Sequence, residues 1–89
     1  MDSLPLPYLV RLVGVYDIVK QYTATYVPIP SGYMGQLLDW PEVVTEGKTV
    51  EECRELLRDA LDEMVLAYKQ MQKPIPEPRH ITEKIPVET

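Results

Sequence analysis

The clearest pattern of apolar and polar positions lies in the second half of the chain, where apolar residues recur every three or four positions. This spacing predicts one amphipathic helix over about residues 49–72, because positions three and four apart share a helix face. Thr49 and Glu52 are spaced as a capping box at its start, and Pro74 prevents its continuation. The positions predicted to face the core are Val50, Cys53, Leu56, Leu57, Ala60, Leu61, Met64, Ala67, Tyr68 and Met71.

Upstream of this helix the sequence shows the alternation and β-branched content that are typical of strands. Two strands over residues 22–29 and 33–40 are predicted to form a hairpin, because Pro30-Ser31-Gly32 supplies turn residues between them. A short third strand over 42–46 precedes the helix, and Ile81–Val87 is able to form a last one. The predicted fold class is α+β: a β-β-β-α-β core in which one long helix packs on a three- to four-stranded antiparallel sheet.

The first twenty residues are compatible with two structures. Leu9, Leu12 and Tyr16 fall at helical spacing, whereas several β-branched residues and Gly14 favour a strand. A short helix is preferred, and the strand stays open. We therefore expect residues 1–20 to form an N-terminal extension that helps the protein to oligomerise, and residues 21–89 to form the domain itself.

Size and charge limit the possible functions. The chain has 89 residues and a net charge of −5, which fits one small domain and argues against nucleic acid or an anionic membrane as the main partner. Its apolar stretches are too short to span a bilayer, and its N-terminus lacks the basic region of a signal peptide. The single cysteine, Cys53, cannot form an internal disulfide, so we expect a cytoplasmic protein.

The negative charge is concentrated in the middle of the chain. Residues 39–63 contain nine acidic and three basic side chains, a net −6, whereas the rest of the chain sums to +1. One interpretation is a solvated helix face, and the other is an acidic patch that meets a basic protein. On the second interpretation the candidate partner-binding residues are Glu51, Glu55, Asp59 and Asp62 on the helix, with Tyr33, Asp39 and Trp40 around the turn after the second strand.

No arrangement of residues points to catalysis. The helix acids lie away from the apolar stripe, so they cannot converge on buried metal ions. Cys53 lies on the apolar stripe, which favours a core thiol. His80 is the only histidine and has no cysteine nearby in the sequence, so a zinc site is not expected. Gly47-Lys48-Thr49 reads as a turn and a helix cap rather than a phosphate loop. We therefore expect no enzyme activity, no metal site and no cofactor.

The aromatic residues predict self-association. A single sheet that is covered by one helix leaves its other face open, and Tyr22, Tyr26, Tyr33 and Trp40 cannot all lie under that helix. An apolar sheet face on a small protein is typical of an interface. We therefore expect a dimer or a tetramer, formed through an open sheet face or a strand edge.

The order and punctuation of these elements resemble the HicB family of bacterial and archaeal antitoxins. The resemblance covers about residues 22–87, except that Glu42 stands where the family usually has glycine. It is carried by Gly32-Tyr33 at the start of the second strand, Leu38-Asp39-Trp40-Pro41 in the following turn, Gly47-Lys48-Thr49-Val50-Glu51-Glu52-Cys53 at the helix start, Leu57, Ala60 and Leu61 within the helix, and Lys73-Pro74-Ile75-Pro76 after it.

Membership of that family would imply a partial ribonuclease H-like fold and a protein-binding role. HicB-like antitoxins mask a small basic toxin that cleaves messenger RNA. Many of them carry an additional operator-binding module, which we do not expect here, so direct binding of nucleic acid is not predicted. The alternative is an oligomeric scaffold of the same fold that has no toxin partner.

Overall fold

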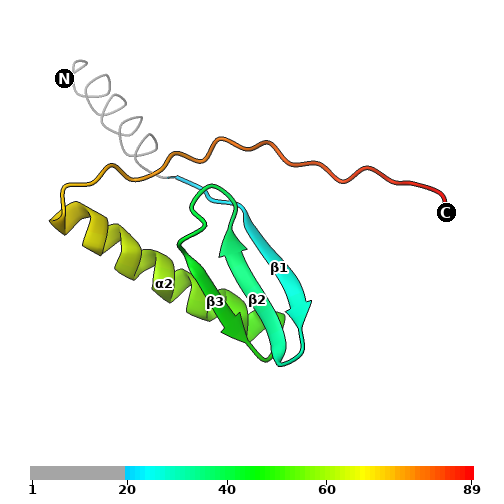
Figure 1. Ribbon diagram of the computed structural model, residues 1–89. Coiled ribbons are helices and arrows are strands. Elements are labelled where there is room, and N and C mark those ends of the chain that lie inside the picture. The colour runs from blue at the N-terminus through cyan, green and yellow to red at the C-terminus, as the bar shows by residue number, and fades with distance from the viewer. Residues whose placement is uncertain (1–19) are drawn as a thin grey trace, which may run out of the picture.

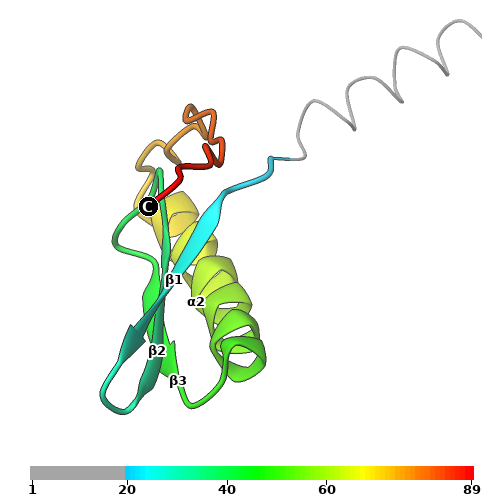
Figure 2. The same cartoon turned by 90° about the vertical axis from the view of Figure 1, so that its right-hand side faces the viewer.

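The computed structural model describes residues 20–89, so the expectations for the N-terminal extension lie outside the described residues. Three antiparallel strands, β1 (Ala24–Ile29), β2 (Gly32–Leu37) and β3 (Val44–Gly47), precede one long helix, α2 (Val50–Gln70). The strands form a sheet in the order β1-β2-β3, and α2 lies across one face of it, so the domain has two layers (Figures 1 and 2). The predicted β-β-β-α order and the α+β class are confirmed.

The hairpin between β1 and β2 is closed by a two-residue turn. Ile29 pairs with Gly32 and Ala24 pairs with Leu37, so the strands are in register over their whole length. Gly32 has a φ of 143°, and a Cβ atom there would lie 2.3 Å from the carbonyl oxygen of Gly47. Only glycine satisfies both conditions, which is why the turn is tight at this residue.

Both ends of α2 are capped by local hydrogen bonds. The Glu52 N–H donates to Thr49 Oγ1 at 3.0 Å, and the Lys48 N–H donates to the Glu52 carboxylate at 2.6 Å. The predicted capping box is therefore present, except that the Glu52 carboxylate accepts from the N–H of Lys48 and not from that of Thr49. At the other end the Lys73 N–H donates to the Tyr68 carbonyl at 2.9 Å, and Gln72 adopts a left-handed φ of 56°. This is a Schellman-type termination.

The core lies between α2 and the inner face of the sheet. It is built from Leu37, Trp40, Val43, Leu57 and Tyr68, beside the fully buried Cys53. The prediction that Leu56 and Met71 face the core is wrong, since they are 42% and 56% exposed. Leu56 lies about a quarter turn around the helix from the centre of the buried face, and Met71 follows the last helical residue.

Within residues 20–89, the aromatic side chains are on the helix side of the sheet, not on its open face. Trp40 packs between Tyr22 and Tyr68, with ring centroids 5.9 Å and 4.8 Å away. Tyr26 packs against the same core, and Tyr33 alternates onto the same side as Leu37. The prediction of an aromatic open face is therefore wrong. By the same alternation the open face carries Thr25, Val27, Met34, Gln36, Val44 and Glu46.

The fourth strand expected over Ile81–Val87 is not formed, because residues 74–89 run on without regular secondary structure. We call residues 75–80 the strap, since they cross the end of the sheet (Figure 1). Tyr22 Oη donates to the Pro76 carbonyl at 2.6 Å, and Lys20 pairs with Glu77 at 2.5 Å. Within the strap, Pro76 and Pro78 have no N–H group, and the N–H groups of Arg79 and His80 donate to Asp39. No helix within residues 20–89 is long and apolar enough to cross a membrane.

Candidate protein-binding surface

The four acidic residues predicted on the helix do share one exposed face. Glu51, Glu55, Asp59 and Asp62 follow one another at steps of four, four and three residues, which places them in a row along α2. All four side chains are exposed, and none forms an ion pair within residues 20–89. We call this row the acidic face. It points away from the sheet, because Cys53 and Leu57 define the opposite, buried face.

Two leucines extend the acidic face with apolar surface that the sequence analysis missed. Leu66 follows Asp62 by four residues, so it continues the acidic row, and it is 58% exposed. Leu56 lies at the edge of the row beside Glu52 and is also exposed. Leu66 could have been identified from the sequence, because it falls outside the apolar stripe when the helix is projected along its axis.

Trp40 is a core residue rather than a surface residue. Its exposure of 2% leaves no side-chain area for a partner, which corrects the predicted binding role. Nε1 of Trp40 is buried and has no hydrogen-bond partner. It nevertheless lies close enough to Glu42 to help lower the pKa of that carboxyl. Tyr68 Oη donates to the Glu42 carboxylate and lowers the pKa of Glu42. Nζ of Lys73 lies 4.5 Å from the centroid of the Tyr68 ring. Its positive charge also lowers the pKa of Glu42.

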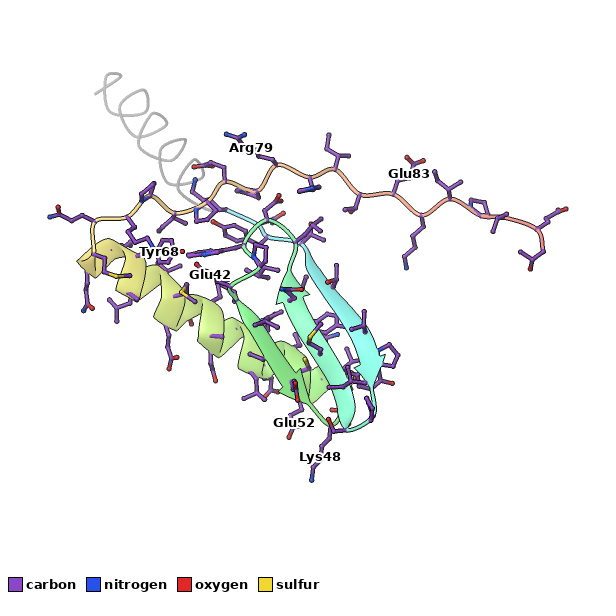
Figure 3. All side chains as sticks on the ribbon, viewed as in Figure 1. Glu42, Lys48, Glu52, Tyr68, Arg79 and Glu83 are labelled. Atoms are coloured by element: carbon purple, nitrogen blue, oxygen red, sulfur yellow. The ribbon has the colours of Figure 1, made fainter. Side chains whose placement is uncertain are left out.

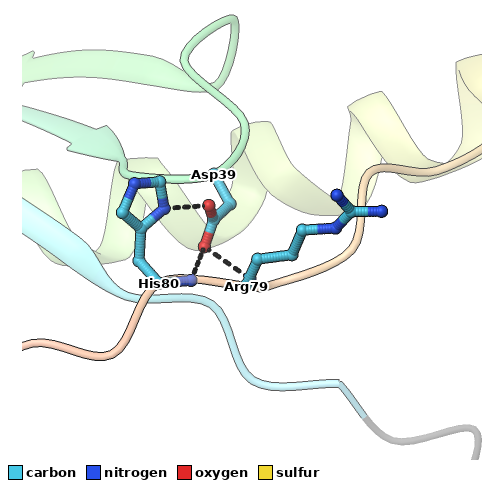
Figure 4. A network of polar contacts seen from close by, with 3 residues as sticks. All are labelled: Asp39, Arg79 and His80. Atoms are coloured by element: carbon cyan, nitrogen blue, oxygen red, sulfur yellow. Dashed lines mark hydrogen bonds and ion pairs between the residues drawn. The ribbon is translucent and has the colours of Figure 1, made fainter.

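Asp39 binds the strap instead of presenting a free carboxylate. Its Oδ2 accepts from the backbone N–H groups of Arg79 and His80 at 2.9 Å and 3.1 Å, and its Oδ1 contacts Nδ1 of His80 (Figure 4). Desolvation acts to raise the pKa of Asp39, but the hydrogen bonds from His80 and Arg79 outweigh it, so the pKa lies below its ordinary value. The sequence contains no local signal for this contact, since Asp39 and His80 are separated by 41 residues.

The structure does not bring the predicted turn residues together. Tyr33 is half-buried beside the β1–β2 turn, where it pairs with Pro28 and Gly47. Asp39 and Trp40 follow the other end of β2. Figure 3 shows the same separation, with Glu42 and Tyr68 at one end of the domain and Lys48 and Glu52 at the other. Of the predicted residues, only the four helix acids form one continuous surface.

The described part of the chain offers no grouping that could bind a metal. Within residues 20–89 no three His, Cys, Asp or Glu side chains come together as a ligand set. Cys53 is fully buried between Gly35 of β2 and Gly47, as expected for a core thiol.

These features define a small α+β protein. Its candidate binding surface is the exposed acidic face of α2. Comparison with known families agrees with this class. Residues 22–76 match a family model that is described as UPF0150-like, and this match spans more than half of the chain. The protein therefore belongs to the UPF0150-like family. No curated protein and no solved structure shows a significant match.

Proposed function

We propose that this protein acts in the cytoplasm as a HicB-like antitoxin, a binding protein without enzyme activity that masks a small basic toxin. The UPF0150-like family is related to the HicB-like antitoxins, which supports a role of this kind. The resemblance to HicB antitoxins implies that this toxin is an enzyme that cleaves messenger RNA.

The acidic face is the observation that carries the proposal. Four carboxylates along α2 project away from the core, and no basic side chain within residues 20–89 pairs with them. A surface of one sign attracts an oppositely charged protein and accelerates their encounter. Leu56 and Leu66 supply apolar area at the same surface, which long-lived complexes require beyond charge.

The test is co-expression with a neighbouring small open reading frame that encodes a basic protein, scored by growth and by co-purification. We expect rescue of growth and a stable complex with the unmodified protein. Replacing Glu55 and Asp59 by lysine should weaken the complex by about tenfold or more, because like charges then face each other. Both residues are exposed, so the thermal unfolding midpoint should stay nearly constant.

A matched control separates local from overall charge. Glu46→Lys with Glu88→Lys changes the net charge by the same amount, but Glu46 lies on the open face of the sheet and Glu88 near the C-terminus. We expect this control to bind within about threefold of the unmodified protein. Equal binding by the Glu55/Asp59 variant and the control would contradict a role for the acidic face.

The second candidate function is a self-assembling scaffold without a toxin partner. It is favoured by one observation, the highly exposed apolar residues Ile81, Ile85 and Val87 after the strap. A neighbouring gene that is neither toxic nor able to form a complex would support this candidate and exclude the antitoxin role.

A further inference from the structure

A groove with a volume of about 520 Å³ lies between β1 and α2. It exists because α2 packs mainly on β2 and β3, which leaves the inner face of β1 partly uncovered. Ala24 and Tyr26 form one wall, and Leu57 and Leu61 form the other. A second hollow shares Lys20, Tyr22 and Leu61 with it and continues toward the end of α2.

The rim of this groove is basic, in contrast to the acidic face. Arg54 and Arg58 project from α2 at its edge, and neither forms an ion pair within residues 20–89. The guanidinium of Arg54 lies 5.9 Å from the centroid of the Tyr26 ring. An occupant of the groove would therefore combine apolar side chains with a negative charge.

The chain carries a segment of that chemistry, which we call the arm, residues 81–87. Ile81, Ile85 and Val87 are 98%, 78% and 79% exposed, so they contact almost nothing in their own domain. In extended backbone the odd-numbered residues share one face, which places Glu83 between the two isoleucines. The arm thus presents an apolar face with one acidic side chain, which complements the groove and its rim.

The free edge of β1 gives the arm a place to pair. β1 is the first strand of the sheet, so its outer backbone edge has no neighbouring strand within residues 20–89. Seven extended residues span about 23 Å, and the six residues of β1 span about 20 Å. Pro86 is tolerated in such an added strand, because it becomes the new edge.

The arm is directed away from its own groove. Asp39 fixes Arg79 and His80, and Figures 1 and 3 show the arm continuing past β1 into solvent, with Glu83 far along it. Residues 79–85 contain no glycine, proline, asparagine or aspartate, which are the residues that reverse a chain. A second copy is therefore the occupant that the geometry favours.

We propose that the arm of one copy adds to the β1 edge of a second copy as a fourth strand, with Ile81 and Ile85 over the groove and Glu83 beside Arg54 and Arg58. The exchange is reciprocal, so each copy supplies one arm and one groove, as in a two-fold dimer. Strand addition of this kind gains backbone hydrogen bonds and apolar burial together. The proposal does not depend on the toxin partner.

A charge exchange measured by sedimentation equilibrium tests the pairing in the full-length chain. Glu83→Arg and Arg58→Glu should each raise the dissociation constant of the dimer by about tenfold, and their combination should restore most of the affinity. Glu88→Arg is the matched control, since it makes the same charge change directly after the arm, on the face opposite to Glu83; it should stay within about twofold.

Several results would overturn the proposal. One is a 10.2 kDa monomer at every concentration tested. Another is a dimer that Glu83→Arg leaves intact, which would place self-association elsewhere, including in residues 1–19. Equal effects of Glu83→Arg and Glu88→Arg would show that only overall charge matters.

Cross-linking distinguishes a second copy from the same chain. The variant with Glu83→Cys and Arg58→Cys should form a disulfide between two chains on oxidation, with doubled mass on a non-reducing gel. Glu83→Cys alone is the control, and the native Cys53 is too buried to react. A disulfide within one chain would show that the arm folds back on its own domain, and either this result or the absence of any cross-link would refute strand exchange.

Discussion

Gly35 and Gly47 determine how closely the first turns of α2 approach the sheet. A Cβ atom on Gly35 would lie 2.8 Å from Cys53 Sγ and 2.9 Å from a ring carbon of Tyr26. A Cβ atom on Gly47 would lie 2.7 Å from the backbone nitrogen of Cys53. The absence of side chains at these two glycines therefore provides the space that the Cys53 thiol fills. Cys53 is buried because it packs into this space between the helix and the sheet.

Gly35→Ala should lower the free energy of unfolding by about 1–2 kcal/mol, because the clash outweighs the reduced backbone entropy of the unfolded chain. Urea unfolding followed by Trp40 fluorescence measures this change. Adding Cys53→Ala should recover part of the loss, since it removes one of the two clashing groups. Strictly additive effects of the two substitutions would contradict direct contact between these positions.

Residues with local partners were predictable from the sequence, and residues with distant partners were not. The Thr49–Glu52 cap spans three positions, and the periodicity that buries Cys53 is visible within the helix. The role of Trp40 depends on Tyr68 and Tyr22, and that of Asp39 depends on His80, 41 residues away. A single sequence contains no signal that identifies such pairs, so two of the seven predicted surface residues have structural partners instead.

At the scale of elements, the turn that terminates α2 contains a residue with an unfavourable backbone conformation. Gln72 has a φ of 56°, which costs a side-chain-bearing residue roughly 1 kcal/mol. The hydrogen bond from the Lys73 N–H to the Tyr68 carbonyl maintains it. Glycine is the usual residue at this position of a Schellman motif.

Gln72→Gly should therefore stabilise the domain by about 0.5–1 kcal/mol, measured as a rise in the urea midpoint without a change in slope. Gln72→Ala is the control, because alanine has no greater tolerance of positive φ; it should leave the midpoint almost unchanged. If both substitutions have the same effect, backbone conformation does not limit stability at this helix end.

The order β-β-β-α and the approximate limits of each element were also predictable, because alternation, turn glycines and the cap are all local. The fourth strand was not correctly predicted. Its alternation is real, since Ile81, Ile85 and Val87 share a face, but alternation does not specify which edge a strand joins. In the described chain, residues 81–87 form no strand and pair with no edge of the sheet.

On the scale of the whole molecule, the strap closes one end of the domain, where the start of β1 lies beside the end of β2. Lys20 and Tyr22 contact it before β1, and Asp39 contacts it after β2. These contacts determine the direction in which the arm leaves the domain. The acidic face lies on the opposite side of α2 from the core, so the two proposed interfaces use different surfaces.

The strap should detach in acid. The folded-state pKa of Asp39 is depressed, so its contribution to holding the strap is fully present above the unfolded value of about 3.9 and is lost as pH falls through the lower folded value. The amide resonances of Arg79 and His80 should therefore shift together below about pH 4. In Asp39→Asn this titration should be absent; its persistence would contradict the assignment of the transition to Asp39.

The strap also separates the fold into early and late events. Each element from β1 to α2 packs on its immediate predecessors, so these contacts close short loops, whereas the contacts from Lys20 to Glu77 and from Tyr22 to Pro76 close loops of 57 and 54 residues. Short loops close first, and chains emerge from the ribosome with the N-terminus leading. The hairpin and helix can thus be complete before the strap docks, and the arm meets a finished β1 edge whichever copy provides it.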